Sequence, residues 1–508
     1  SYTKETEKKR SEGAQMTFID FLYKLDGWVW GTPLIVLIMV VGIYYMVKGK
    51  FFPFVHFGHA VKNTVLASST ESGKSGDGKI SPYRAFCLAL GGAVGMGNIS
   101  GVATSIAVGG PGSIFWMWVW AFFGMMIKTA ETSLGLYYRH KEPDGKYSGS
   151  AMHYMERGIK GEMGWKFGRP LAILFAVSLF MMVLQGSGAY TVGETLSASF
   201  GLNLMAVVIV YVLFVVYLLI RGENAIGRVA EKLVPIMCGA YLLATIVILL
   251  MNITYVPTMF AEIFKGAFTG TAAVGGFAGS VVSLTIRQGV ARSVYSNEAG
   301  NGTSPLIHGS ADTIHPARQG LWGAVEVFCD TLVVCTCSGL AILATGTWSS
   351  GVTGAPLGVL AFTTAFGEAG RYFLGIMTVL FAFTTSTTWY LFYQNILTYL
   401  LEKWPKAQKA AHKVFTVAFP LIMVGNAALV YYSNSDATLF WTIVSIVTAF
   451  PLFFNVLALI ALRKKFWALL KDYKARYMGI GQVDPNFHVF AEDDPEVMAK
   501  INKNLGRS

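Results

Sequence analysis

Charge is scarce in this 508-residue chain. Lys, Arg, Asp and Glu together make up 14% of the residues and hydrophobic residues make up 54%, whereas soluble domains carry about 25% charged residues. Because so little charge cannot cover the surface of a soluble protein of this length, the composition predicts a polytopic membrane protein. At ~20 residues for each crossing, the length allows roughly ten to twelve transmembrane helices.

Cysteine and histidine are scarce as well. The 5 cysteines all fall in apolar stretches at spacings that match no zinc site, and the 8 histidines are scattered. A membrane enzyme would need clustered His, Asp or Cys, so we expect neither enzymatic activity nor a cofactor. The net charge is +11. The basic residues that produce it lie between apolar segments, where they set membrane topology, so the charge does not indicate nucleic-acid binding.

Length and charged flanks predict eleven spans. They lie at about 29–47, 83–108, 113–138, 171–199, 204–220, 232–251, 273–296, 320–346, 371–401, 414–431 and 438–461. Basic residues gather in alternate loops, which the positive-inside rule places in the cytoplasm. The C-terminus is then cytoplasmic and the N-terminus is outside. We expect the chain in a plasma membrane, which in a bacterium is the inner membrane.

The most informative segment is Gly91–Gly101, which reads GGAVGMGNISG inside the second span. Glycine at this density breaks a helix, and a break at membrane depth leaves backbone groups that lipid cannot satisfy. The break therefore persists where it lines a polar cavity or a binding site, as in transporters with discontinuous helices. A dinucleotide-binding loop is excluded, because the spacing is not G-x-G-x-x-G and no βαβ unit surrounds it.

A second glycine-rich stretch, Gly270 with Gly275–Ser280, opens the span 273–296. Setting aside the accessory helix 29–47 leaves two five-helix halves, 83–251 and 273–461, each opening with a broken helix. Tails at 1–28 and 462–508 and an external connector at 252–272 complete the chain. We therefore predict an all-α polytopic protein with a leucine-transporter-like 5+5 inverted repeat, one extra N-terminal helix and two discontinuous helices. The alternative is that these glycines only let helices pack closely.

The breaks indicate the chemistry of the ligands. Helix N–H groups freed after Gly97 suit a carboxylate. Carbonyls freed on the other side suit Na⁺, a hard cation that takes oxygen ligands. The hydroxyl run Thr384–Thr388, just before Trp389, exceeds what hydrogen bonding within a helix requires, and it supports an ion site. A zwitterionic amino acid needs both kinds of group.

Several motifs in order make the chain similar to the alanine/glycine:cation symporters, members of the amino acid–polyamine–cation superfamily with the leucine-transporter fold. The motifs are Gly95–Val102, Gly109–Gly112 running into Phe115–Trp118, Gly275–Ser280, Gly289–Arg292, Ser296–Gly300 and His315–Gly320. The resemblance runs from about Leu25 to Leu462. The chain departs from the family pattern at Met96, Tyr393-Gln394 and Gln185–Ala189, positions that bear on the identity of the substrate.

The resemblance implies roles for individual residues. Those implied to bind substrate are Gly95, Gly97, Asn98, Gln185, Phe277, Gly279, Thr385 and Trp389. Those implied to bind sodium are Gly91, Val94, Asn98, Thr384 and Thr385.

Charged residues inside spans are costly and usually functional. Arg287, Arg292 and Glu298 follow the second glycine-rich stretch; they are candidates for an inner gate, or else charges that fix a helix end. Lys128 and Glu131 lie three positions apart on one helix and are expected to pair. Asp330 needs a polar partner that the sequence does not identify.

The predicted function is secondary active transport, in which a Na⁺ gradient drives uptake of a small neutral amino acid, alanine or glycine, by alternating access. The expected partners are the substrate, Na⁺ and the lipid bilayer, and a monomer suffices for this function. Another small solute, H⁺ coupling and a transporter-like sensor stay open as alternatives. A channel would need a repeated filter or a ring of pore charges, and none is visible in the sequence.

Overall fold

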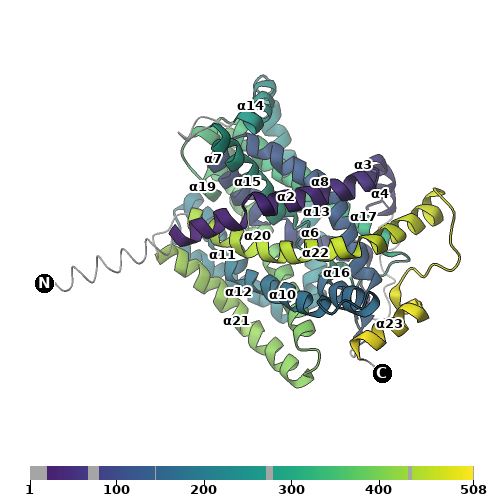
Figure 1. Ribbon diagram of the computed structural model, residues 1–508. Helices are drawn as coiled ribbons and strands as arrows, with labels where there is room; N and C mark the ends of the chain where they lie inside the picture. Colours follow the sequence, from purple (N-terminus) through teal and green to yellow (C-terminus); the bar gives the residue numbers. More distant parts are fainter. Residues whose placement is uncertain (1–19, 67–78, 143–144, 270–277, 433–436, 507–508) are drawn as a thin grey trace.

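The computed structural model shows a nearly all-helical protein (Figure 1). It describes residues 20–66, 79–142, 145–269, 278–432 and 437–506. Within these ranges 8 helices are long and apolar enough to cross a membrane, and a pair bent by 48° at a short break forms a ninth crossing. The chain is a multi-pass membrane protein.

The first part of the chain contains an N-terminal helix and the elements of five crossings. In order these are α2 (Thr32–Lys48), α3 (Phe52–Val55), α4 (Phe57–Asn63), α6 (Pro82–Ala93), η1 (Gly97–Gly101), α7 (Val102–Gly109), α8 (Gly112–Tyr137), β1 (His140–Lys141), β2 (Tyr147–Ser148), α9 (Ala151–His153), η2 (Tyr154–Glu162), α10 (Gly168–Met181), η3 (Met182–Gly188), α11 (Ala189–Phe200), α12 (Leu204–Ile220) and α13 (Glu223–Met251). The two short strands pair antiparallel, with His140 opposite Ser148.

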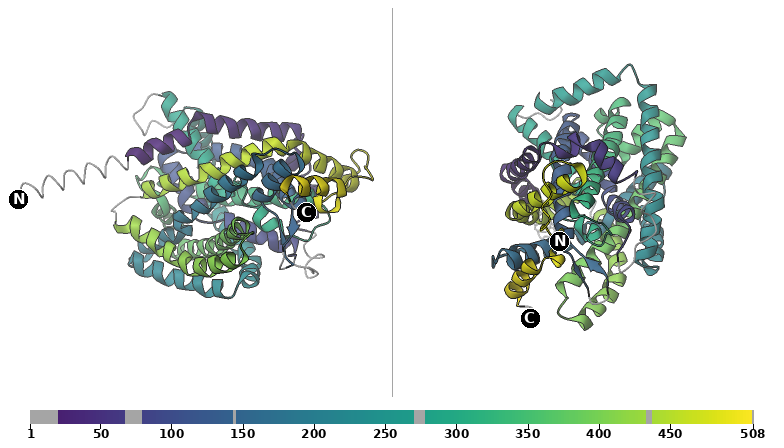
Figure 2. Two further views of the ribbon diagram at one scale, coloured as in Figure 1. Left: turned by 60° about the horizontal axis from the view of Figure 1, so that its bottom comes forward. Right: turned by 90° about the vertical axis from the view of Figure 1, so that its right-hand side faces the viewer.

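The second part contains the remaining crossings and a C-terminal helix. In order these are α14 (Val256–Thr269), α15 (Ala278–Asn297), α16 (Pro305–His308), α17 (Pro316–Val327), η4 (Phe328–Cys335), α18 (Thr336–Ala344), η5 (Thr347–Ser349), α19 (Gly354–Phe366), α20 (Glu368–Leu400), α21 (Pro405–Tyr432), α22 (Ala437–Met478), η6 (Ala491–Asp493) and α23 (Pro495–Leu505). Helix α2 lies beside α22 (Figure 2), where the Tyr45 hydroxyl donates to Leu459 O at 2.7 Å.

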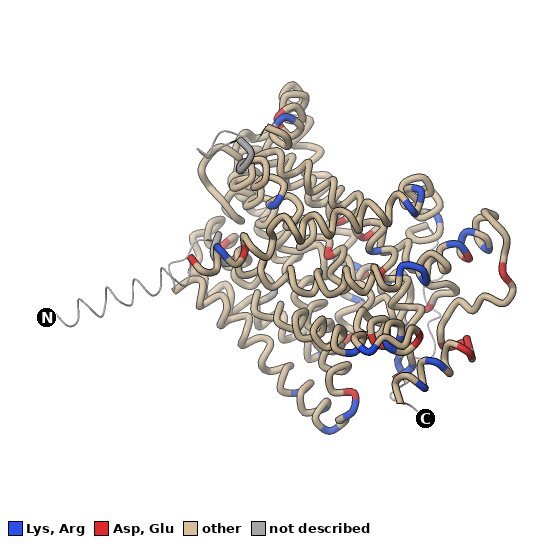
Figure 3. Tube along the Cα trace, viewed as in Figure 1, with Lys and Arg blue, Asp and Glu red and all other residues tan. Residues whose placement is uncertain are grey.

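Each of the eleven expected spans coincides with a helix. Nine of them overlap the long apolar helices and the bent pair. The span 204–220 is α12, which has 17 residues, and the span 273–296 overlaps α15, which begins at Ala278. Charged residues gather toward the end of the molecule that carries the C-terminus, and fewer lie along the middle of the bundle (Figure 3).

The first broken helix is confirmed. Helix α6 ends at Ala93, Val94 is extended with ψ of 96°, and the chain becomes helical again at Gly97 in a wide π-type turn. The break lies tight against α20, because a Cβ on Gly95 would lie 2.3 Å from Thr385 Oγ1. Only glycine fits at this contact without displacing α20.

The second break that the sequence predicted, at Gly270 with Gly275–Ser280, lies mostly outside the described residues. Helix α15 runs without interruption from Ala278 to Asn297, and a further interruption follows it. The described chain leaves helical geometry after Asn297 and forms the buried segment 298–304 before α16. Gly300 and Gly302 in this segment adopt φ of 94° and 70°, which glycine reaches at little cost. We call 298–304 the second break.

The C-terminal segment folds back onto the end of the bundle. The Asn504 amide of α23 donates to Gly161 O of η2 at 2.7 Å. The Arg139 guanidinium, just after α8, lies 3.1 Å from the Glu492 carboxylate. These contacts join the C-terminal helix to the loops at this end.

His315 fixes the start of α17 to α22. Its Nδ1 accepts the Ala317 backbone N–H at 3.0 Å, and its Nε2 lies 3.2 Å from Asp472 Oδ2. Burial lowers the pKa of His315 to about 4, although Asp472 opposes that shift. The ring is therefore neutral near pH 7 and donates its Nε2–H to Asp472.

Replacing Gly289 tests the close packing of α15 on α8. An alanine Cβ there would lie 2.4 Å from Ser113 O and 2.7 Å from Trp116 Cβ, so we expect Gly289→Ala to lower stability by roughly 1–3 kcal/mol. Thermal unfolding in detergent measures this. Gly425→Ala in α21, where nothing lies within 4 Å of the added atom, is the matched control and should unfold no earlier than the parent. Equal melting temperatures for the two variants would contradict the packing described.

Candidate functional site

Three of the oxygens implied to bind sodium converge where α6 ends. The Thr385 hydroxyl lies 3.2 Å from Gly91 O and 3.2 Å from Val94 O. Thr384 is adjacent, with its Cβ 3.3 Å from the position a Gly91 Cβ would take, but its hydroxyl donates within its own helix to Phe381 O at 3.1 Å. The cluster of Gly91 O, Val94 O and Thr385 Oγ1 is therefore the part of the predicted ion site that the geometry assembles.

Asn98 holds the first break in shape. Its Oδ1 accepts the Gly95 backbone N–H at 2.8 Å, and its Nδ2–H donates to Asp330 Oδ1 at 2.8 Å. The side chain is fully buried. Both ends of the amide are therefore engaged by protein groups, which orients the glycine backbone of Gly95 and Gly97 between α20 and α15.

Gln185 and Trp389 flank the same break. Gln185 lies in η3, is 4% exposed, and its Oε1 has no hydrogen-bond partner among the described residues. Three residues later, a Cβ on Gly188 would lie 2.5 Å from Met96 Cγ, which places η3 against the break. Trp389, one turn beyond Thr385 on α20, packs on Tyr393 with ring centroids 5.6 Å apart.

Of the two remaining substrate candidates, the structure describes only Gly279, and it does not bring this residue to the break. Phe277 lies outside the described residues. Gly279 is in the first turn of α15, 17 positions before Ser296, which is about 25 Å along a helix axis. Ser296, in contrast, lies at the first break: its Cα is 3.4 Å from the position of a Gly97 Cβ.

The three gate candidates separate into two groups. Arg287 lies 3.9 Å from Asp26, and both line a cavity of about 50 Å³ with Arg292 and Thr104 of α7. In the expected topology α7 is the outer half of its span, so the two arginines lie on the outer side of the break. Glu298 begins the second break, with φ of 57°, and its carboxylate accepts the Thr303 hydroxyl at 2.5 Å.

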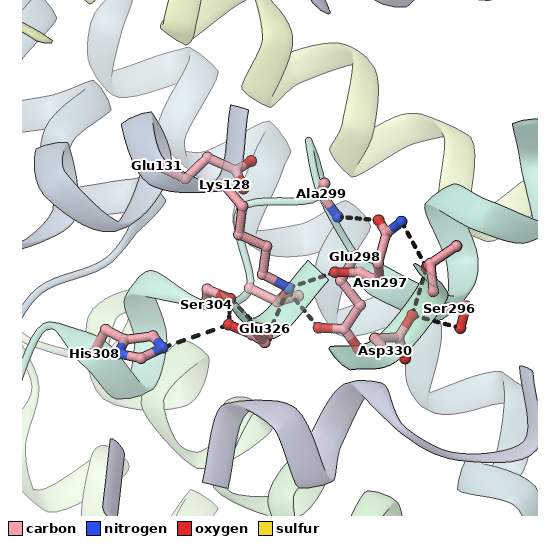
Figure 4. A network of polar contacts seen from close by, with 12 residues as sticks. Lys128, Glu131, Ser296, Asn297, Glu298, Ala299, Ser304, His308, Glu326 and Asp330 are labelled. Atoms are coloured by element: carbon pink, nitrogen blue, oxygen red, sulfur yellow. Dashed lines mark hydrogen bonds and ion pairs between the residues drawn. The ribbon is translucent and has the colours of Figure 1, made fainter. Parts of the chain in front are cut away.

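The buried lysine has a different partner from the one the sequence predicted. Lys128 Nζ lies 2.7 Å from Glu326 Oε1 of α17 and also donates to Asn297 O (Figure 4). Glu131 accepts instead from the Gly302 N–H at 3.0 Å and from the Asn455 amide. The expected pairing of Lys128 with Glu131 is therefore replaced by contacts to α17 and to the second break, which a rule for neighbours on one helix cannot foresee.

Further polar residues line the second break. Ser304 donates to the Glu326 carboxylate at 3.0 Å, and His308 Nε2 lies 3.5 Å from its Oε2. Asn301 is fully buried, and neither atom of its amide has a partner in the described part of the chain. Sequence analysis did not assign Asn301, Thr303 or Ser304. In the sequence these residues have the composition of a solvated loop, and only the fold shows that they are buried.

Asp330 joins the two breaks. Its carboxylate accepts from Ser296 at the end of α15 at 2.8 Å (Figure 4). It also accepts from Asn98 of the first break at 2.8 Å and from Thr331 at 2.7 Å. These are the polar partners that the sequence could not identify. The arrangement joins the first break to the end of α15 through a fully buried carboxyl group.

Around the two breaks, the buried carboxyl groups of the described residues outnumber the buried ammonium groups. Four buried carboxyl groups, on Glu131, Glu298, Glu326 and Asp330, share the buried ammonium of Lys128, which directly contacts Glu326. Burying carboxylates without matching cations is costly. Protonation of these carboxyl groups or a bound cation would each relieve this cost.

A polar cavity of about 470 Å³ reaches α20 from the end of the molecule that holds β1 and β2. Its lining includes Tyr390, Gln394 and Asn395 of α20, Ile307 of α16 and Glu142. Tyr390 follows Trp389, so the cavity approaches the break from this end.

Comparisons with known proteins agree on one family. The sodium:alanine symporter family profile matches residues 15–487. Similar proteins include the sodium/alanine symporter AgcS of Methanococcus maripaludis, 33% identical, with 81% of this chain and 89% of that protein covered. The sodium/proton-dependent alanine carrier protein of Bacillus sp. PS3 is 31% identical, with 79% and 90% covered. The probable sodium/glutamine symporter GlnT of Bacillus subtilis is 30% identical, with 91% of each covered.

Solved structures show the fold. The chain matches MhsT in complex with L-phenylalanine with a TM-score of 0.50 at 12% identity, covering 85% of this chain and 96% of that chain. It matches the substrate-bound outward-open state of a Na⁺-coupled sialic acid symporter with a TM-score of 0.50 at 12% identity, covering 80% and 83%. The chain has the leucine-transporter fold, as its sequence predicted.

Removing the buried ammonium tests the Lys128–Glu326 pair. Lys128→Met leaves Glu326 without its cation, so we expect a loss of about 3–5 kcal/mol of stability, measured by thermal unfolding in detergent. The double variant Lys128→Met/Glu326→Gln should recover part of this loss, because no unpaired charge remains at that position. Lys146→Met removes the exposed pair with Glu223, where the same 2.7 Å separation should be worth at most about 1 kcal/mol. A double variant less stable than either single variant would contradict the pairing.

Proposed function

Because the chain belongs to the sodium:alanine symporter family, we propose that it carries alanine or glycine into the cell together with Na⁺ by alternating access. The family and the structural neighbours are transporters and not enzymes. The observation that carries the proposal is the convergence of Thr385 Oγ1 with two backbone carbonyls at a helix break. Three oxygens in a dry setting suit a hard monovalent cation.

The proposed substrate site adjoins this ion site. Gly95, Gly97 and Asn98 would receive the amino acid carboxylate, because glycine lets a ligand approach the backbone closely. The buried Gln185 Oε1, which has no partner among the described residues, would accept from the substrate ammonium. Trp389, packed on Tyr393, would limit the side chain to a small one. For Phe277 and Gly279, a substrate role rests on the family resemblance alone.

The proposed cycle has one closure at each end. Arg287 with Asp26, 3.9 Å apart, would form part of the outer closure, and the cavity that ends at Tyr390 would be the inner path. Glu298 would act on the inner side, because it begins the second break. Two five-helix halves, 83–251 and 273–461, would move around this centre, with 29–47 as an accessory helix. We place the chain in a bacterial inner membrane with its C-terminus in the cytoplasm.

H⁺ is the alternative coupling ion, and one observation favours it. Glu131 is fully buried, and its Oε2 has no hydrogen-bond partner in the described part of the chain. Carboxyl groups facing the interior of a membrane protein often bind protons in transport cycles. The PS3 relative is named for both ions, sodium and proton.

Uptake into proteoliposomes distinguishes these functions. We expect labelled alanine and glycine to accumulate under an inward Na⁺ gradient and to stay at the baseline under an equal K⁺ gradient. Accumulation driven by a pH gradient without Na⁺ would establish the H⁺ alternative. No accumulation under any gradient, from protein shown to be folded, would contradict both.

A valine at Thr385 tests the ion site. Thr385→Val removes the hydroxyl that meets Gly91 O and Val94 O, so the Na⁺ concentration for half-maximal uptake should rise at least about tenfold, the equivalent of roughly one good charge-assisted hydrogen bond. Thr387→Val is the matched control, because that hydroxyl donates within its own helix to Phe383 O at 2.8 Å. The control should keep the parental Na⁺ dependence. Equal shifts in the two variants would remove Thr385 from the site.

A further inference from the structure

Three potential metal ligands meet outside the membrane-spanning helices. His140 begins β1, Glu142 follows that strand, and His153 ends α9. One ring nitrogen from each histidine and one Glu142 carboxylate oxygen all lie within 4.8 Å of one another. His140 Nε2 is 3.2 Å from Glu142 Oε1, and the two imidazole ring centroids are 4.7 Å apart.

The donor set matches Zn²⁺ in type and in size. Two imidazoles with one carboxylate form a known zinc ligand set, and metal–ligand distances of about 2.0–2.2 Å place tetrahedral ligands roughly 3.4 Å apart. The present cluster needs to contract by a little over 1 Å at its widest, which side-chain rotation can supply. The side chains of His140 and Glu142 are 15% and 13% exposed, so an ion held here would be largely shielded from water.

The surroundings favour metal binding over a plain ion pair. His153 Nδ1 lies 2.6 Å from Ser150 Oγ, so its Nε2 is the atom to face an ion. Metal-bound histidines usually have such a partner on the other nitrogen. His140 Nδ1 is buried and has no hydrogen-bond partner among the residues described, so turning this ring breaks no bond at that atom.

We propose that His140, Glu142 and His153 bind a divalent transition-metal ion of the Zn²⁺ type and that this ion slows transport. The ion would fasten the β1–β2 hairpin to α9. Glu142 also lines the cavity that reaches Tyr390, so an ion held by its carboxylate lies at the wall of that cavity. The His153 ring packs on Tyr399 with centroids 5.4 Å apart, which ties the site to the end of α20, the helix that carries Thr385.

Metal titration of the purified full-length chain tests the site directly. After treatment with chelator, the protein in detergent is titrated with ZnCl₂ by calorimetry, with MgCl₂ as a reference ion that prefers oxygen ligands. We expect one Zn²⁺ per chain, a higher unfolding temperature with Zn²⁺, and no comparable response to Mg²⁺. His140→Ala and His153→Ala should each weaken Zn²⁺ binding at least about tenfold.

His412→Ala is the matched control, because His412 lines the same cavity but is not part of the cluster. It should bind Zn²⁺ as the parent does. His140→Gln replaces His140→Ala if the alanine variant does not fold. Absence of Zn²⁺ binding by the parent, or equal binding by the parent and the His140→Ala/His153→Ala double variant, overturns the proposal. Since these readouts do not involve transport, they hold whichever solute the protein carries.

Uptake with and without Zn²⁺ then tests the regulatory part. Zn²⁺ should lower the initial rate of uptake by the parent and by His412→Ala, and it should leave the rate of His140→Ala unchanged. Equal inhibition of all three would assign the effect to another site and overturn the regulatory part of the proposal.

Discussion

The structure depends on one constraint, which is that a helix interrupted inside a membrane must find partners for its freed polar groups within the protein. Here two interruptions meet, and Asp330 is the group they share. It accepts from Asn98 of the first break and from Ser296 beside the second. Asn98 in turn accepts the Gly95 N–H. A single buried carboxyl group thus ties the side chain that holds the first break in shape to the end of α15.

Shared polar contacts also couple the breaks to the surrounding helices. Lys128 on α8 reaches Glu326 on α17 and the carbonyl of Asn297, the last residue of α15. Its ammonium group is shared by the buried carboxyl groups of Glu131, Glu298, Glu326 and Asp330. If the end of α15 moved away from α8 and α17, the buried Lys128 ammonium would lose its contact with Asn297 O. Loss of a partner by a buried charge is costly. A conformational cycle that keeps these contacts must move the three helices as one body, which favours rigid-body motion over local unwinding.

The sequence predicted the membrane class, the positions of the membrane-spanning helices and the first break, because these follow from local composition. Hydropathy and segment length locate the membrane-spanning helices. The glycines of Gly91–Gly101 stand out because they interrupt an apolar run. It also predicted that Thr385 meets Gly91 and Val94, but through a family resemblance and not through spacing. The pairing of Lys128 was wrong, because its partner Glu326 is almost 200 positions away and proximity along one helix is the only contact that a sequence displays directly.

The interruption at 298–304 was missed for a related reason. Gly300 and Gly302 are spaced among Glu298, Asn301, Thr303 and Ser304, which resemble a solvated loop in composition. Only the fold shows that these polar residues are buried. Their burial, not the number of glycines, distinguishes a functional break from an external turn, and burial is a property of the tertiary structure.

The contact between Thr385 and the first break gives a physical reason for ion binding and helix position to be coupled. A hydroxyl has one proton to donate, yet two carbonyls, those of Gly91 and Val94, lie at the same 3.2 Å distance from it. One of the two is therefore always short of a full hydrogen bond. A cation placed between the three oxygens would accept lone pairs from all of them together and draw the end of α6 against α20. Since Gly95 already lies so close to Thr385 that no Cβ fits between them, the two helices can close on an ion without an intervening side chain.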